Sequence, residues 1–130
     1  MTLLLDSDIC IAAMKKEPKV LARIRDLEYG HVALPSVVVG ELSFGAEKSQ
    51  VRDLALLKLG SFLKRFSIVS FDYRGAQHYG RIRSMLEKAG TPIGHNDYLI
   101  AATALANEYP LLTRNVREFA RVPGLRWETI

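Results

Sequence analysis

Short apolar runs of strand length alternate with longer helical patterns along the chain, and this alternation limits the folds that the sequence can adopt. The runs are rich in Leu, Val, Ile and aromatic residues and are bounded by Asp, Pro, Gly or charged residues, as is typical of strands. They predict strands at Thr2–Leu5, Val32–Leu34, Ser67–Phe71, Leu111–Thr113 and Leu125–Trp127. Strands that alternate with helices in this way favour an α/β sandwich with a mainly parallel central sheet.

Three longer segments repeat apolar residues at helical spacing and predict helices over residues 51–66, 76–89 and 97–107. In the first segment, helical spacing relates Val51, Leu54, Leu57 (with Leu56) and Phe62. The second is closed by Gly90, because glycine commonly ends a helix. The third (DYLIAATALAN) is Ala-rich and apolar almost all round, which predicts a buried helix with Asn96 as its N-cap.

The length and composition are those of one globular domain, which we expect to span residues 1–130. Hydrophobic residues make up 48% of the chain and charged residues 25%, and no apolar run approaches the roughly 18 residues of a membrane span. Asp6 and Asp8 interrupt the N-terminal apolar run, unlike in a signal peptide. Cys10 is the only cysteine, which excludes an intrachain disulfide and a cysteine-based zinc site. We therefore expect a cytoplasmic protein that does not enter a membrane.

The chain is basic, with a net charge of +4, and its arginines are unevenly distributed. Four of them crowd the last seventeen residues: Arg114, Arg117, Arg121 and Arg126. A basic balance permits an anionic partner such as nucleic acid, although it does not require one.

Carboxylates stand in apolar surroundings at three places. Asp6 directly follows the first strand, Glu41 lies in the first turns of the helix after the second strand, and Asp97 begins the buried helix. An ionised carboxylate in such a setting costs several kcal/mol unless it is paired or binds a cation. Because ligands gather at the carboxyl ends of parallel strands, we expect the three to share one edge of the sheet. A fourth polar side chain, Asn115, follows the fourth strand.

Each carboxylate also has a purely structural interpretation. Asp97 could interact favourably with the dipole of its helix, and Asp6 could hydrogen-bond the backbone of its own turn. Glu41 could pair with an arginine. A single cation site accounts for all three at once. Oxygen ligands without cysteine or paired histidines suit Mg²⁺ or Mn²⁺ rather than zinc, and no phosphate-binding glycine loop supports nucleotide chemistry.

Four segments in succession carry a family resemblance: LLDSDICI, SVVVGELSFGAEKS, TPIGHNDYLIAATAL and LLTRNVREFARVPGLRWE. Together they span nearly the whole chain. They resemble the PIN-domain ribonucleases, specifically the VapC toxins of bacterial toxin–antitoxin pairs, whose opening motif is LLDTNxxI. The resemblance implies a PIN-like α/β/α sandwich and a Mg²⁺- or Mn²⁺-dependent endoribonuclease that hydrolyses structured RNA, either tRNA or rRNA. It also implies a homodimer and a cognate VapB-type antitoxin that blocks the site.

Residue by residue, the resemblance assigns the catalytic metal ligands to Asp6, Glu41 and Asp97, with Asn115 and Asp8 as additional candidates. Asp8 stands where the family usually carries Asn, so it either adds to metal affinity or turns to solvent or to an arginine. Supporting roles fall on Ser7, which would orient the first aspartate, and on Thr113. Two arginines, Arg114 and Arg117, are candidates for holding the RNA backbone. In the implied mechanism, bound metal activates a water for attack on the phosphodiester.

Three other functions compete with this one. A strand followed by DxD also resembles haloacid-dehalogenase-type phosphatases, in which Asp6 would attack phosphate and Asp8 would act as acid and base. A PIN domain could also bind RNA without cutting it. A PIN nuclease that processes RNA outside any toxin–antitoxin pair would differ only in its context.

Overall fold

The described part of the chain, residues 2–27 and 30–130 of a computed structural model, contains one five-stranded sheet. Its strands are β1 (Leu3–Leu5), β2 (Val32–Pro35), β3 (Ser67–Val69), β4 (Leu111–Leu112) and β5 (Trp127–Glu128). Their order is β3-β2-β1-β4-β5, and every neighbouring pair is parallel. The expected parallel α/β architecture is therefore confirmed. All five predicted strands are present, although most are shorter than predicted because few residues of each form ladder pairs.

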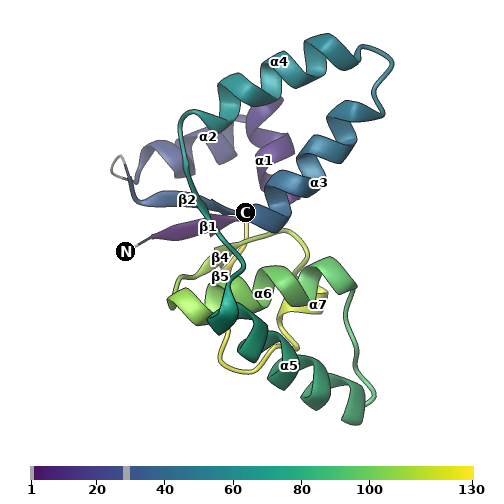
Figure 1. Ribbon diagram of the computed structural model, residues 1–130. Coiled ribbons are helices and arrows are strands. Elements are labelled where there is room, and N and C mark those ends of the chain that lie inside the picture. The colour runs from purple at the N-terminus through teal and green to yellow at the C-terminus, as the bar shows by residue number, and fades with distance from the viewer. Residues whose placement is uncertain (1, 28–29) are drawn as a thin grey trace.

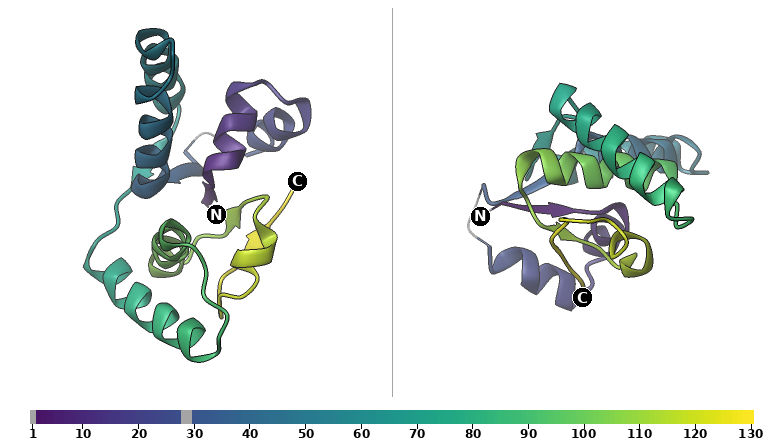
Figure 2. Two further views of the ribbon diagram at one scale, coloured as in Figure 1. Left: turned by 90° about the vertical axis from the view of Figure 1, so that its right-hand side faces the viewer. Right: turned by 90° about the horizontal axis from the view of Figure 1, so that it is seen from below.

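Seven helices connect and cover the strands in the described residues. They are α1 (Ser7–Met14), α2 (Pro18–Arg25), α3 (Ser36–Glu47), α4 (Arg52–Leu63), α5 (Tyr73–Lys88), α6 (His95–Asn107) and α7 (Val116–Phe119). Helix α6 packs on one face of the sheet with α5 against its outer side, and α1 and α2 lie on the other face (Figures 1 and 2). Helices α3 and α4 form an antiparallel pair that projects from the sheet as an arm (Figure 2).

The core is built from the strands and from helix faces that the sequence pattern locates only in part. The three leucines of β1 are completely buried, and α6 is buried almost all round, as its composition predicts. In α4, however, Leu54 and Leu57 point outward, and Leu57 is 69% exposed. The core-facing side of α4 carries Phe62, which the pattern includes, and Leu59, which it does not. Gly90 follows α5 with a φ of 74°, so its predicted role as a helix stop is confirmed.

The predicted cap of α6 is wrong. The helix begins at His95 with Gly94 as N-cap, and no side chain caps it. Asn96 is the second residue of the helix, and its amide donates to Glu41 across the molecule (3.3 Å). A capping residue bonds its own helix, whereas this side chain is engaged in a tertiary contact.

No helix in the described ranges is long and apolar enough to cross a membrane.

Candidate active site

Asp6 lies where β1 ends and α1 begins, at the centre of the carboxyl edge of the sheet. Its side chain caps α1, because Oδ1 accepts a hydrogen bond from the Ser7 backbone N–H (2.8 Å). Oδ2 accepts a bond from the Thr113 hydroxyl (2.6 Å), which reaches it from the end of the adjacent strand β4. Only 6% of Asp6 is exposed, so these two donors hold a nearly buried carboxylate in one orientation.

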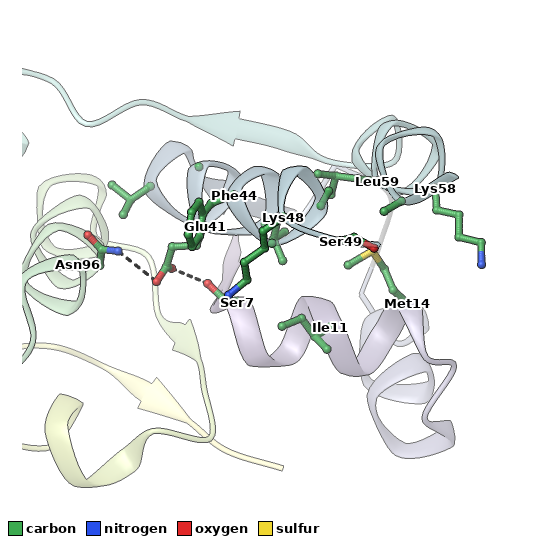
Figure 3. Close-up of a pocket in the computed structure, with 16 residues that line it drawn as sticks. Ser7, Ile11, Met14, Glu41, Phe44, Lys48, Ser49, Lys58, Leu59 and Asn96 are labelled. Carbon is green, nitrogen blue, oxygen red and sulfur yellow. Dashed lines mark hydrogen bonds between the residues drawn. The ribbon is translucent and has the colours of Figure 1, made fainter. Parts of the chain in front are cut away.

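Glu41 faces the same edge from α3. Val38, Leu42 and Ala46 bury one face of this helix, and Glu41 lies beside them, half-buried. Its Oε1 accepts a bond from the Ser7 hydroxyl (2.5 Å), and its Oε2 accepts the bond from Asn96 (Figure 3). Ser7 therefore serves two carboxylates, Asp6 through its backbone and Glu41 through its hydroxyl.

Asp97, the third residue of α6, is half-buried and bonded to the loop after β4. Its Oδ2 accepts a hydrogen bond from the amide of Asn115 (3.1 Å), which also lies 3.3 Å from Oε2 of Glu118. Glu118, in the short helix α7, is a fourth carboxylate of the site that the sequence reasoning missed. It follows Asn115 by three residues, a spacing that places both side chains on the same side of a helical turn.

Burial raises the pKa of two of these carboxyl groups, those of Asp6 and Asp97. Burial raises the pKa of Asp6 to about 6; repulsion from Asp8 and Glu41 adds to the rise, and the bond from Thr113 opposes it. Burial also raises the pKa of Asp97 to about 8, together with a hydrogen bond to Glu118 and repulsion from Glu118, Asp6 and Glu41. The same hydrogen bond lowers the pKa of Glu118, so Asp97 holds the proton that the two side chains share.

Asp8 is bonded to the backbone of an arginine in the loop after β4. Its Oδ2 accepts a hydrogen bond from the backbone N–H of Arg114 (3.1 Å). The guanidinium of Arg114 donates to both carboxylate oxygens of Glu17, at 3.1 and 3.2 Å. Arg117 and His95 are exposed, on α7 and at the start of α6.

An elongated groove of about 910 Å³ runs from the site along the arm (Figure 3). Ser7, Glu41 and Asn96 lie at its end nearest the site. Its walls are mainly apolar side chains of α1, α3 and α4, among them Ile11, Met14, Phe44, Ala55 and Leu59. Two lysines also line it, Lys48 and Lys58.

The chemistry of the donor set fits a hard divalent cation. Asp6, Glu41 and Asp97 offer carboxylate oxygens at one edge of the sheet, and their mutual repulsion would be relieved by a positive charge. As the side chains stand, no three Asp, Glu, His or Cys residues among those described converge on one ion position. Glu41 accepts hydrogen bonds from Ser7 and Asn96. Asp97 is hydrogen-bonded to Asn115 and Glu118. Binding of a metal ion by all three carboxylates therefore requires these bonds to rearrange.

Comparison with known proteins gives consistent matches over nearly the whole length. A family model described as PIN domain matches residues 3–125. The tRNA(fMet)-specific endonuclease VapC of Shigella flexneri is 38% identical over 125 residues, which cover 96% of this chain and 95% of that protein. Ribonuclease VapC2 of Rickettsia felis is 37% identical over 127 residues, with coverages of 96% and 95%.

Among solved structures, a chain of VapBC2 from Rickettsia felis, crystallised bound to a DNA fragment from its promoter, superposes with a TM-score of 0.95. The two chains are 35% identical, and the match covers 100% of this chain and 99% of the other. The sequence motifs, the parallel sheet with acidic side chains at its carboxyl edge, and these matches agree. The chain belongs to the PIN domain family and, within it, to the VapC ribonucleases.

Proposed function

We propose that this protein is the toxin of a VapBC-type pair, a Mg²⁺-dependent endoribonuclease in which residues 1–130 act as one PIN domain. The observation that carries the proposal is the position of Asp6, Glu41 and Asp97 along one edge of the sheet. Among the described residues, none of these three forms a salt bridge. The raised pKa values of Asp6 and Asp97 indicate a cluster that gains from a bound cation.

In the proposed mechanism, the protein positions its carboxylates for the ion and for the RNA phosphate. Thr113 holds Asp6, and Ser7 and Asn96 hold Glu41. Mg²⁺, or Mn²⁺ in its place, would lower the pKa of a water and neutralise charge on the phosphodiester. Asp97 contributes once it releases its proton. This assignment gives Asp8 no acid–base role, because its carboxylate is bonded to the backbone of Arg114. That contact disfavours the phosphatase alternative.

We propose tRNA as the substrate class, and an initiator tRNA as the first substrate to test. The support is the 38% identity to an enzyme named as a tRNA(fMet)-specific endonuclease. Cleavage of RNA would take place in the cytoplasm. We further propose that the protein is a homodimer, as the VapC family resemblance implies.

The test is cleavage of purified initiator tRNA by the purified protein, with bulk rRNA as a second substrate. Activity should vanish in EDTA, return with Mg²⁺ or Mn²⁺ and largely fail with Ca²⁺, whose looser coordination holds a water poorly for attack. Metal-activated water leaves 5′-phosphate and 3′-hydroxyl ends. Asp6→Asn, Glu41→Gln and Asp97→Asn should each abolish cleavage. Asp53→Asn is the matched control, because the Asp53 side chain is 98% exposed and lies outside the site.

Products with 5′-hydroxyl and 2′,3′-cyclic phosphate ends would contradict the metal mechanism, because such ends arise when the RNA 2′-hydroxyl is the nucleophile. Tight RNA binding in EDTA without cleavage in any metal would instead support a binding protein. Growth arrest on expression, relieved by a small protein encoded beside it, distinguishes a toxin from an RNA-processing nuclease.

We propose that the antitoxin lies in the groove beside the site. The groove is apolar along its walls and ends at Glu41, so it fits an apolar segment followed by a basic side chain. An arginine or lysine placed at Glu41 would take the position of the cation.

A further inference from the structure

Each residue of the short loop after β4 is tied to a different part of the molecule. The Thr113 hydroxyl donates to Asp6, and it also accepts a bond from the backbone N–H of Asn115 (2.9 Å). The Asn115 amide reaches Asp97. Loop 113–115 therefore connects Asp6 to Asp97, and its position determines how these two carboxylates lie relative to each other.

Arg114, the middle residue of this loop, uses its guanidinium within the protein. Nη1 and Nη2 donate to the two oxygens of Glu17, and Nε donates to the carbonyl oxygen of Ile130 (3.2 Å). Glu17 is the N-cap residue of α2, in the turn that joins α1 to α2. A bidentate pair of this kind has a fixed geometry, unlike a single contact between flexible side chains.

Asp8 holds the backbone of the same residue. Its Oδ2 accepts from the Arg114 N–H, while its Oδ1 is buried without a hydrogen-bond partner in the described structure. Arg114 thus contacts two carboxylates, Glu17 through its guanidinium and Asp8 through its backbone, and both attract its positive charge. Both carboxylates belong to the segment around α1, so Arg114 ties the loop to the helix that Asp6 caps.

We propose that Asp8, Arg114 and Glu17 form a strut that positions loop 113–115, and that Arg114 does not bind the RNA. This inference replaces the expectation from sequence that Arg114 contacts the RNA backbone. It rests on the proposed function for its catalytic consequence, but the strut itself is a property of the fold. Its members are positioning residues, because they act through Thr113 and Asn115.

The substitution Glu17→Ala distinguishes a structural role of Arg114 from an RNA-binding role. If Arg114 bound RNA, Glu17→Ala would free a cation and strengthen RNA binding, and Arg114→Ala would weaken binding and its dependence on salt. If Arg114 is part of a strut, both substitutions release the loop and act in the same direction. They then lower kcat while KM stays nearly constant, because the loss falls on the transition state.

The experiment measures kcat and KM for initiator tRNA with Glu17→Ala, Arg114→Ala and Asp8→Ala, and with the conservative variant Asp8→Asn. We expect kcat to fall about fivefold for Glu17→Ala and more for the other two alanine variants, with KM within about twofold. Asp8→Asn retains an oxygen for the Arg114 N–H and should restore most of the rate. Glu47→Ala is the matched control, because it removes an exposed ion pair, Glu47–Arg52, that does not involve the loop. It should change neither kcat nor KM.

Backbone hydrogen exchange followed by NMR tests the strut without any cleavage. The amides of Arg114 and Asn115 should exchange faster in Glu17→Ala and Asp8→Ala, and at the parent rate in Glu47→Ala. A parent protein that cuts no RNA, with these exchange changes present, would refute the proposed function and leave the strut standing. Unchanged exchange in both variants, or a lower KM in Glu17→Ala, would overturn the strut.

Discussion

At the scale of single residues, the physical cost of a buried charge identified most of the candidate site residues in the sequence. Asp6, Glu41 and Asp97 stand in apolar runs, where an unpaired carboxylate is too costly to be incidental. Glu118 gave no such signal, because VREF is typical of a short surface helix and only the fold brings it to Asp97. The partner of Asp8 was equally hidden, since a backbone N–H more than a hundred residues away leaves no trace in local sequence.

The raised pKa of Asp97 predicts a pH-dependent stability of the metal-free protein. Below pH 4 the folded and the unfolded chains both hold the Asp97 proton. As the pH rises from about 4 to about 8, the unfolded chain releases it first, so this carboxyl progressively destabilises the fold. Asp97→Asn removes the effect and should raise the free energy of unfolding at pH 8 by about 2 kcal/mol. Solvent screening of the partly exposed Asp97 side chain keeps this value well below the full pKa difference.

The measurement is urea unfolding in EDTA at pH 4.5, 6 and 8 for the parent and for Asp97→Asn. The gap between them should widen with pH, and Mn²⁺ should stabilise the parent more than the variant. A gap that is constant over this range would show that Asp97 titrates near its ordinary pKa.

At the scale of elements, the sequence located the helices better than it oriented them. Periodicity identified α4, but of the predicted positions Val51, Leu54 and Leu57 face outward, whereas Phe62 faces inward beside Leu59. Both stripes are apolar at helical spacing, so only the packing of α4 against α3 decides between them. The predicted N-cap of α6 is wrong for a related reason, because the Asn96 side chain bonds to Glu41 and not to its own helix.

The orientation of α4 predicts that truncation costs stability on its buried side and almost none on its exposed side. Phe62→Ala should lower the free energy of unfolding by about 3 kcal/mol, because the ring is 8% exposed and packs near Phe66. Leu57→Ala should change it by less than about 0.5 kcal/mol. Thermal or urea unfolding of the two variants measures the difference, and equal losses would mean that the stripes are assigned to the wrong sides.

At the scale of the whole molecule, the groove and the acidic site form one continuous surface, because both include Glu41 and Ser7. A partner that fills the groove can therefore reach the carboxylates at the edge of the sheet. Ala55→Arg places a bulky charge in the groove wall, so it should abolish inhibition by the cognate antitoxin while tRNA cleavage is retained. Inhibition of the parent should weaken as Mg²⁺ rises through the millimolar range, because an inserted basic side chain and the ion compete for the same carboxylates.

Titration of the antitoxin into a cleavage assay measures both effects. The matched control is Ala76→Arg, which adds the same side chain to an exposed position of α5. Inhibition that persists in Ala55→Arg, or that ignores Mg²⁺, would show that the antitoxin acts from another surface.

The placement of β4 beside β1 also has a consequence for synthesis on the ribosome. The hydrogen bond from Thr113 to Asp6 joins residues 107 apart, and Asn115 and Glu118 come later still. A nascent chain thus carries Asp6 long before it carries the groups that orient the Asp6 carboxylate. At about 5–20 residues per second, the residues between Asp6 and Thr113 take about five to twenty seconds to be added. A stalled chain that ends before Leu111 should therefore cut no RNA on the ribosome, so the producing cell meets an active nuclease only after the central strands of the sheet have all been synthesised.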